Sequence, residues 1–354
     1  MGHVGAKLSA AVGPETPVPA DGRLSRSTAN WELPPWVDDG FERDEMAARC
    51  ESVQAWPFLR TGVAPREGQR LYMNIHYAHD GSHPYTYLYR GLWEGRAVAV
   101  KVVECRQDSR EAREALNEAV LTEGLDCPHL VKTLRHALQC DSLDQECTFW
   151  LVQQLCTHGT LIQAAEAGLL REERSLVAAP DMGAVLRTLR EVAAGMAFLH
   201  GCGILHRDLT GHNVLLDEAE PSTSDRRGFT CRLADFGMAR LAQLQSISTG
   251  SFGTVTHMSP ELLVDGKLSP AADVWSFGIL CWEAYSGIRA FAGLPLPNII
   301  YRVTSGSGRL ELPSDAPAGF KALVEACLNT DRHQRPDFPS VLSTLDCLLA
   351  QEEG

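Results

Sequence analysis

Hydrophobic and polar residues follow two different periods along the chain, and each period predicts a different kind of element. The segment TYLYRGLWEGRAVAVKVVE, at 86–104, alternates apolar and polar residues around a glycine-marked turn, which is typical of a β-hairpin. Residues 107–125 place apolar residues at helical spacing beside acidic and basic ones and predict an amphipathic helix. The apolar run TFWLVQQL, at 148–155, predicts a buried strand.

Helical spacing dominates the remainder of the chain. It predicts three helices, over 182–200, 274–286 and 320–327. The polar run EAEPSTSDRRG, at 218–228, predicts an exposed loop between two strands. A β-rich region followed by a helical one predicts an α+β fold, with a small N-terminal lobe at about 72–155 and a larger C-terminal lobe at about 156–350.

An N-terminal extension at 1–71 precedes the expected folded domain at 72–350. Residues 1–30 are rich in Pro, Ala, Gly and Ser and show no periodicity, so we expect them to be largely disordered. The pattern leaves open whether the extension is a tail or belongs to a longer regulatory region.

The composition narrows the classes of partner. With 44% hydrophobic residues, the chain has ample material for a buried core. Its formal net charge of −13 argues against a nucleic-acid partner, because proteins that bind nucleic acid usually carry a basic face. The longest apolar stretch, at 274–288, is too short and too polar to span a bilayer. We therefore expect a soluble, cytoplasmic or otherwise intracellular protein without a transmembrane segment; its oligomeric state is left open.

Two residue types are informative through their distribution. The eleven cysteines form no CxxC pair and no metal-type spacing with histidine, which favours reduced, mostly buried thiols. Only five of the 32 basic residues are lysines, so a lysine inside a motif carries more weight than usual. These are Lys7, Lys101, Lys132, Lys267 and Lys321.

Four short motifs occur in a fixed order. They are VAVK ending at Lys101, HRD at 206–208 followed by Asn213, DFG at 235–237, and SPE at 259–261. This ordered set is the protein-kinase signature, and the chain resembles the eukaryotic protein kinases over about 72–349. The segments GTVTHMSPE, DVWSFGILCWEAYSG and DRHQRPDF most resemble the tyrosine-kinase-like group of Ser/Thr kinases. The resemblance implies a bilobal kinase fold, protein substrates, and Mg-ATP as phosphoryl donor with Mn²⁺ as an alternative metal.

The resemblance also implies which residues handle the phosphates. Phosphoryl transfer needs charge neutralisation and in-line positioning more than covalent chemistry. Lys101 would contact the α- and β-phosphates and would be held by a carboxylate. Glu118 is the best candidate, with Glu123 and Glu114 as alternatives on the same predicted helix. Because helix surfaces ordinarily carry glutamates, the choice among the three stays open at this point.

The other catalytic roles implied by the resemblance fall on the later motifs. Asn213 and Asp235 would bind Mg²⁺ through hard oxygen ligands. Asp208 would accept the proton of the substrate hydroxyl. Thr254 would hydrogen-bond to Asp208, which favours Ser or Thr as the acceptor. A cap or turn role for Asp208 would leave the other three motifs unexplained.

The adenine pocket is implied to lie where the two lobes meet. Gln153 would be the gatekeeper and would narrow the back of the pocket, while Gln154 to Cys156 would form the hinge. The residues expected to contact the nucleotide are Gly81, Leu88, Ala99, Lys101, Gln153, Gln154, Cys156 and Leu215.

Further residues are implied to be structural or regulatory. Glu261 and Arg335 would form a buried ion pair, and Asp273 would accept backbone N–H groups of the catalytic loop. A phosphate between DFG and SPE would pair with Arg207 and order that segment, although hydroxyls are also ordinary in exposed loops. The candidate hydroxyls are Ser246, Ser248, Thr249 and Ser251.

The chain departs from the kinase pattern in its glycine-rich loop. Of the three glycine positions only Gly81 is kept, since His83 and Thr86 occupy the other two and Pro84 lies between them. Glycines at these positions let backbone N–H groups approach the phosphates. We therefore expect weaker or slower nucleotide binding.

A second departure lies in HRDLTGHN, at 206–213. Thr210 stands where Ser/Thr kinases usually carry lysine, and His212 is the nearest residue able to carry a positive charge. The loop keeps its acid–base and metal groups, which favours an active but slow Ser/Thr kinase. The alternatives are a pseudokinase-like scaffold that binds nucleotide weakly and a small-molecule kinase, which Glu261 and Arg335 disfavour.

Overall fold

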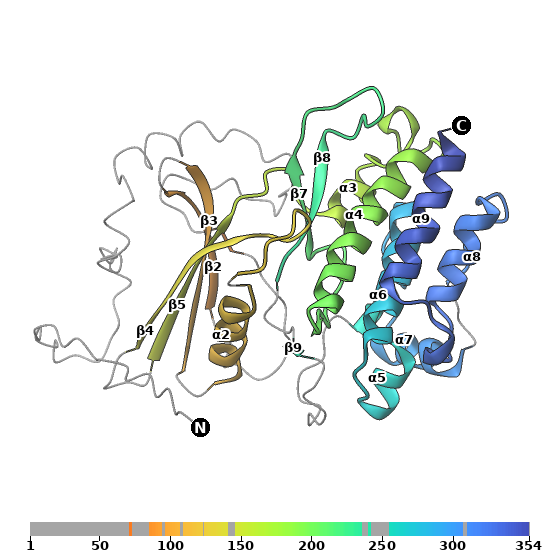
Figure 1. The fold of residues 1–354 in the computed structure, drawn as a ribbon. Helices are drawn as coiled ribbons and strands as arrows, with labels where there is room; N and C mark the ends of the chain where they lie inside the picture. Colours follow the sequence, from red (N-terminus) through yellow and green to blue (C-terminus); the bar gives the residue numbers. More distant parts are fainter. Residues whose placement is uncertain are drawn as a thin grey trace, which may run out of the picture. The chain divides into compact units, whose positions relative to one another are not determined.

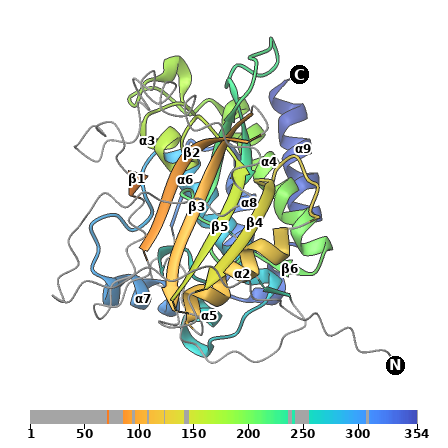
Figure 2. The same cartoon turned by 90° about the vertical axis from the view of Figure 1, so that its left-hand side faces the viewer.

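A five-stranded antiparallel sheet forms the N-terminal part of the described chain (Figure 1). The computed structural model describes residues 71–72, 85–93, 96–106, 109–122, 124–140, 146–235, 240–241, 255–306 and 310–353. The sheet order is β1-β2-β3-β5-β4, and Figure 2 shows β2, β3, β5 and β4 side by side. The strands are β1 (Leu71–Tyr72), β2 (Tyr85–Trp93), β3 (Arg96–Arg106), β4 (Thr133–Cys140) and β5 (Glu146–Gln154). The predicted hairpin is confirmed as β2 and β3, and the predicted buried strand as β5.

Alternation along β3 gives the sheet two different faces. Ala99 and Lys101 are half-buried and alternate with three buried valines, Val98, Val100 and Val102. The register places Ala99 opposite Gln153 of β5 and Lys101 opposite Leu88 of β2. Directly opposed residues point to the same side of a sheet. Four of the positions predicted to line the nucleotide pocket therefore share one face.

One cysteine departs from the expected reduced state. Cys147 of β5 is disulfide-bonded in the structure, so the expectation of reduced thiols is wrong at this position. In the strand register Cys147 lies opposite Cys140 of β4 and Cys105 of β3. Strand pairing thus brings together cysteines that the sequence keeps apart.

Helix α2 (Arg110–Thr122) packs against this sheet and confirms the helix predicted over 107–125. Its first turn is capped by Ser109, whose Oγ accepts a hydrogen bond from the Ala112 N–H at 3.1 Å. The buried face consists of small residues and one charged residue, namely Ala112, Ala115, Glu118, Ala119 and Thr122. A fully buried glutamate needs a partner, which points to a role for Glu118 beyond packing.

The C-terminal part is helical and carries two short β-ribbons (Figure 1). Its helices are α3 (Leu161–Glu166), α4 (Met182–Gly201), α5 (Pro260–Asp265), α6 (Pro270–Ser286), α7 (Leu296–Ser305), α8 (Ala318–Cys327) and α9 (Phe338–Glu352). The ribbons pair β6 (Ile204–Leu205) with β9 (Arg240–Leu241), and β7 (Val214–Glu218) with β8 (Phe229–Leu233). The three helices predicted from apolar spacing are confirmed as α4, α6 and α8.

Helix α6 is buried on all sides and anchors the C-terminal core. Its Phe277 meets Phe338 of α9 edge to face, with ring centroids 5.6 Å apart. A Cβ atom at Gly278 would lie 2.8 Å from the Leu328 side chain, so this glycine permits the close approach of the segment that follows α8. The helix ends at Gly287, which has the left-handed φ of 72° typical of a C-terminal glycine. This rigid element carries Asp273 into the active site.

The loop between β7 and β8 is only partly as predicted. It joins the two strands at 219–228 and is largely exposed, but Arg227 is buried. The Arg227 guanidinium contacts Glu191 of α4 and Asp225 through short hydrogen bonds, and donates to Thr188 at 3.0 Å. These carboxylates compensate the buried charge and attach the loop to α4.

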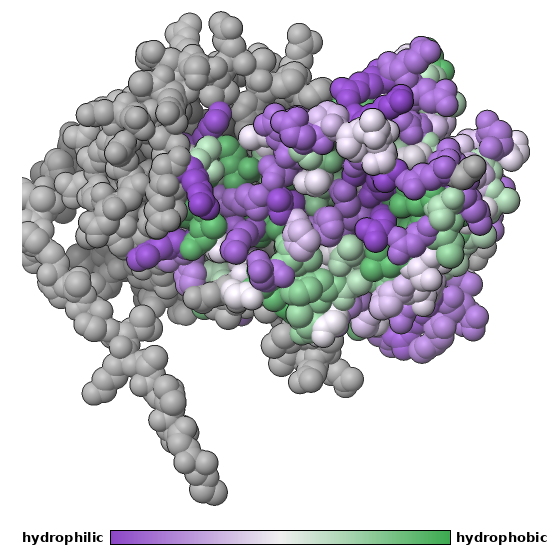
Figure 3. All heavy atoms as spheres, turned by 45° about the horizontal axis from the view of Figure 1, so that its top comes forward, coloured by the Kyte–Doolittle hydropathy of each residue, from purple (hydrophilic) through white to green (hydrophobic). Residues whose placement is uncertain are grey.

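Figure 3 shows hydrophilic and hydrophobic side chains interspersed over the described part of the face that it draws. Exposed large apolar residues include Val264 of α5 and Tyr301 of α7. Among the described residues, no helix is both long enough and apolar enough to cross a membrane.

Candidate active site

Three distant segments meet at the Lys101 ammonium group. Its Nζ lies 2.8 Å from Glu118 Oε2 of α2 and 3.2 Å from Asp235 Oδ1, which follows β8. Lys101 is therefore held between two carboxylates from opposite sides of the site. Of the three glutamates considered above, Glu118 is the one that the structure brings to Lys101; Glu123 and the Glu114 side chain lie outside the described residues.

The two carboxylates keep Lys101 charged. Burial alone would lower the pKa of its ammonium group, but Asp235 and Glu118 outweigh burial and raise the pKa above its usual value of 10.5. Lys101 thus remains a cation over the physiological pH range. A cation fixed in a partly dry site stabilises phosphate charge more strongly than it would in water.

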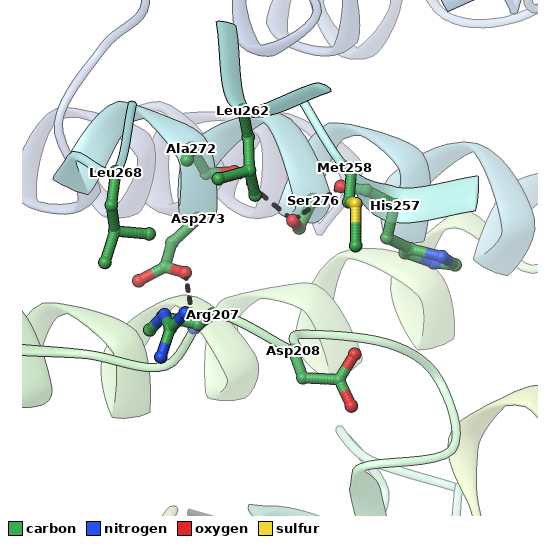
Figure 4. Close-up of a pocket in the computed structure, with 9 residues that line it drawn as sticks. All are labelled: Arg207, Asp208, His257, Met258, Leu262, Leu268, Ala272, Asp273 and Ser276. Carbon is green, nitrogen blue, oxygen red and sulfur yellow. Dashed lines mark hydrogen bonds between the residues drawn. The ribbon is translucent and has the colours of Figure 1, made fainter. Parts of the chain in front are cut away.

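Asp273 of α6 fixes the backbone of the HRD loop through hydrogen bonds. Its carboxylate accepts the backbone N–H of His206 at 2.9 Å and that of Arg207 at 2.8 Å. Its Oδ2 also lies 2.8 Å from His200 Nε2 at the end of α4. Figure 4 shows Asp273 reaching from α6 to Arg207. These bonds hold Arg207 at a φ of 71°, a value that costs a non-glycine residue about 1 kcal/mol or more.

Asp208 and Asn213 are joined by the turn that follows. Asn213 Nδ2 donates to Asp208 Oδ2 at 2.9 Å and to the Asp208 carbonyl at 2.8 Å. The amide nitrogen of Asn213 is therefore engaged within the loop. The Asn213 carbonyl also accepts the Ala234 N–H at 2.8 Å, so the HRD loop is tied to the residue before Asp235.

Asp235 adopts a left-handed backbone conformation with a φ of 60°. Such a φ is uncommon outside glycine and marks a residue whose surroundings fix it. The Asp235 side chain is 31% exposed while one of its oxygens faces Lys101. The side chain is thus partly exposed to solvent beside the Lys101 ammonium group.

A small pocket lies between the catalytic loop and the segment that leads into α5 and α6. Figure 4 shows Arg207 and Asp208 on one side and residues of α5 and α6 on the other. The lining residues are Arg207, Asp208, His257, Met258, Leu262, Leu268, Ala272, Asp273 and Ser276. Polar and apolar side chains thus share the wall of this pocket, and Asp208 is one of its charged groups.

The predicted hinge connects the two lobes through polar side chains. Gln154 Nε2 donates to Asp217 Oδ2 at 2.8 Å, and Arg232 Nε donates to the same oxygen at 2.9 Å. Arg232 also donates to the Pro128 carbonyl. Cys156 is buried, and burial raises the pKa of its thiol to about 12, so it is an unreactive packing residue. In the sheet register, Leu88 of β2 lies opposite Lys101, and Ala99 of β3 lies two residues before Lys101. Leu215 of β7 forms an isolated β-bridge with Thr160.

Glu261 and Arg335 form a two-pronged ion pair beneath α5. Arg335 Nη1 and Nη2 lie 2.7 and 2.8 Å from the two Glu261 oxygens. Arg335 also donates to the carbonyls of Asn329 and Ala271, each at 2.8 Å, and stacks over the Trp275 ring. The pair thereby joins the segments before α9 and within α6 to the SPE motif.

Acid should weaken the fold through Glu261 and Asp273. Burial would raise the pKa of Glu261, but hydrogen bonds from Arg335 outweigh burial and lower the pKa below its usual value of 4.5. Burial would also raise the pKa of Asp273, but the hydrogen bond with His200 is the main effect that outweighs it, and the pKa falls below its usual value of 3.8. A carboxylate with a lowered folded pKa stabilises the fold above its unfolded pKa, and this stabilisation is lost as pH falls through the folded pKa.

We therefore expect the free energy of unfolding in urea to be nearly constant between about pH 7 and pH 5 and to decrease below about pH 4.5. Glu261→Gln should reduce the free energy of unfolding by on the order of 3 kcal/mol at pH 7, because the charge of Arg335 stays buried without its partner. The same substitution should make the loss of stability below about pH 4.5 smaller than in wild type. Urea midpoints that do not change between pH 7 and pH 3 would contradict this assignment.

His212 is exposed at its position in the loop after Thr210. Partial desolvation lowers the pKa of its imidazole below its usual value, and the Arg289 guanidinium adds to this effect, which disfavours the charged form at pH 7. Among the other nearby groups, Glu283 and Glu166 raise the pKa of His212, and His257 lowers it. The side chains of His257 and Glu283 lie 3.3 Å apart in the C-terminal lobe. Thr210 itself is buried.

Several predicted residues lie outside the described part of the chain. They are Gly81, His83, Pro84, Thr254, Ser246, Ser248, Thr249 and Ser251. Thr86, the last glycine position of the loop, lies within β2 opposite Val103. The proposals that rest on the glycine loop and on the segment between DFG and SPE therefore stay predictions.

Sequence reasoning missed three residues that support the site. His200 contacts Asp273. The only sign of this role in the sequence is that His200 is a histidine shortly before the HRD motif. Thr122 and Thr133 connect α2 to β4 at 2.7 Å between their hydroxyl oxygens. Nothing in their spacing reveals this contact, because it depends on where α2 lies across the sheet.

The family model described as protein tyrosine and serine/threonine kinase matches residues 80–345 of this chain. The chain belongs to the protein kinase family. The resemblance and the bilobal α+β fold predicted from the motifs are thereby confirmed. The family generally uses ATP and Mg²⁺ and acts on protein substrates.

Named relatives of this kinase include Ser/Thr kinases. Human mitogen-activated protein kinase kinase kinase 11 is 33% identical over 273 residues, which is 75% of this chain and 30% of the human protein. The serine/threonine/tyrosine-protein kinase HT1 of Arabidopsis thaliana is 26% identical over 318 residues, 87% of this chain and 74% of the plant protein. The kinase thus spans about a third of the length of the first of these relatives.

Proposed function

We propose that this kinase transfers the γ-phosphoryl group of Mg-ATP to Ser or Thr side chains of protein substrates. The observation that carries the proposal is the assembled set of charged groups: Lys101 between Glu118 and Asp235, with Asp208 bonded to Asn213. Phosphoryl transfer requires a half-buried lysine whose charge is balanced by two carboxylates, whereas a scaffold without catalysis does not. The assembly supports transfer even though the glycine loop is reduced.

The oxygen groups present fit a magnesium ion. In phosphoryl-transfer sites Mg²⁺ is usually held by one or two protein groups and completed by phosphates and water. Asp235 would supply a carboxylate oxygen, and Asn213 would supply its amide oxygen, since its amide nitrogen bonds to Asp208. Among the described residues, no group of three or more His, Cys, Asp or Glu is placed to hold a metal ion. When bound, the metal neutralises charge on the phosphates.

The protein groups then divide the remaining work. Lys101 binds the nonbridging phosphate oxygens, and Glu118 keeps its ammonium group in place. Asp208, one of the residues that line the pocket in Figure 4, would orient the acceptor hydroxyl and receive its proton. Leu88, Ala99 and Leu215 contact the adenine, with Gln154 to Cys156 as the hinge and Gln153 behind it.

Thr254 and the names of the relatives support Ser/Thr as the acceptor. We expect phosphoamino-acid analysis of the labelled product to yield phosphoserine or phosphothreonine. Because one relative carries tyrosine in its name, the analysis should include tyrosine-containing substrates at equal concentration. A product that is mainly phosphotyrosine would overturn the assignment of the acceptor.

Thr210 favours a second candidate, a pseudokinase-like scaffold, and a gain-of-function variant separates the two. In an active kinase, Thr210→Lys adds a cation near the γ-phosphate, which stabilises the transition state more than the ground state. One such charge-assisted contact is worth about 1–2 kcal/mol, so kcat should rise roughly tenfold.

The matched control is His212→Ala, which should leave kcat nearly unchanged because the charged form of His212 is disfavoured at pH 7. A Thr210→Lys variant that folds normally and is no faster than wild type would contradict the missing-charge account. A large loss of activity in His212→Ala would assign the charge to that histidine.

A further inference from the structure

A buried hydrogen bond behind Lys101 joins the predicted gatekeeper to the glutamate of α2. Gln153 Nε2 donates to Glu118 Oε1 at 3.0 Å, while Lys101 Nζ contacts the other oxygen, Oε2, at 2.8 Å. Gln153 is 8% exposed and Glu118 1% exposed. Both oxygens of one carboxylate are therefore satisfied by donors from two neighbouring strands, β5 and β3.

Two threonines extend this contact into a network. Thr122 Oγ1 donates to the Glu118 carbonyl at 2.6 Å and lies 2.7 Å from Thr133 Oγ1. Gln153 Nε2 also lies 3.4 Å from Thr133 Oγ1. Glu118 is thus attached through its side chain to β5 and through its backbone, by way of Thr122, to β4.

The energetic consequence follows from burial. An aliphatic residue at position 153 would leave Glu118 Oε1 buried without a donor, and an unsatisfied charged group in the interior is strongly destabilising. The structure would then relieve the strain by turning Glu118 toward solvent. Lys101 would lose a partner and keep only Asp235, which lies on the other side of the site.

We propose that Gln153 is a positioning residue: by donating to Glu118 it holds α2 and Lys101 in the orientation that phosphoryl transfer requires. The consequence for catalysis rests on the proposed function, whereas the coupling of Gln153 to Glu118 does not. The neighbouring Gln154 provides a matched control, because its amide donates to Asp217 of β7 instead.

The first test measures stability and needs no kinase activity. Unfolding in urea is followed for wild type, Gln153→Leu, Glu118→Leu and the double variant. We expect the effects of the two single substitutions on the unfolding equilibrium constant to be non-additive by about fivefold or more. The pair Gln154→Leu and Glu118→Leu should be additive within about twofold. Additivity in the Gln153 cycle would overturn the proposal.

The second test uses charge in place of deletion. In Gln153→Glu the introduced carboxyl can donate to Glu118 only while it is protonated, and two adjacent ionised carboxylates repel each other. The charged described groups that face Glu118 are Lys101 from β3 and, beyond it, Asp235 after β8; from β5 and β4 the partners Gln153 and Thr133 are uncharged. The variant should therefore lose activity relative to wild type as pH rises from 6 to 8.

For the Gln153→Leu variant we expect kcat to fall roughly tenfold to a hundredfold, with the shape of its pH profile unchanged. A Gln153→Glu profile that parallels wild type across this range would contradict the positioning role. If wild type transfers no phosphate at all, the proposed function fails, and the urea cycle still decides whether Gln153 holds Glu118.

Discussion

Replacing Lys101 with methionine is expected to reduce phosphoryl transfer by on the order of a hundredfold or more. Methionine keeps the length and apolar stem of the side chain but removes the cation that lies between Glu118 and Asp235. Preorganised charge in a partly dry site is usually among the largest contributions to catalysis. The two carboxylates would also face each other without a counter-charge, so the geometry of α2 should change as well.

The comparison is best made with Lys132→Met, which carries the same substitution on an exposed side chain paired only with Asp126. Lys132→Met should retain wild-type transfer. Initial rates are measured at saturating ATP, with thermal unfolding of each variant as a check on folding. Near wild-type transfer by Lys101→Met would show that the nucleotide site has been placed wrongly.

Replacing Asp235 with alanine is expected to abolish the divalent-dependent part of ATP binding and to lower transfer by on the order of a thousandfold. The substitution removes the oxygen proposed for the metal and one of the two partners of Lys101. ATP affinity is measured by calorimetry with Mg²⁺, with Mn²⁺ and with excess EDTA.

Wild type should bind ATP more tightly with either metal than with EDTA, and Asp235→Ala should bind equally weakly in all three conditions. Asp265→Ala, at an exposed carboxylate of α5 paired with Lys267, should behave as wild type. Equal ATP affinity of wild type with Mg²⁺ and with EDTA would count against the metal assignment and in favour of a scaffold.

Lys101, Asp208, Asn213 and Asp235 could be assigned because they stand in short motifs that resemble those of the protein kinases. The order of these motifs, together with SPE, carried the resemblance from which the kinase fold was expected. Helix α6 could likewise be predicted from apolar spacing, since almost its whole length is buried.

Contacts that depend on sheet register could not be predicted. The bond between Gln153 and Glu118 arises because β5 lies next to β3, so that Gln153 opposes Ala99 near the Lys101 side chain. Charge type alone also misled in one place. Arg227 lies in a segment whose polarity indicated full exposure, yet its side chain is buried against Glu191 and Asp225. The sequence shows which charged groups exist, whereas the fold decides which partners each of them meets.

The most direct test of the account is transfer of labelled phosphate from ATP by the purified chain, compared with Asp208→Asn. The substitution keeps the shape of the side chain and its contact with Asn213, but removes the carboxylate that receives the acceptor proton. The account predicts divalent-dependent incorporation on Ser or Thr by wild type, and a loss of about a hundredfold or more in Asp208→Asn with ATP binding retained. Equal incorporation by the two proteins, or none by well-folded wild type, would contradict it.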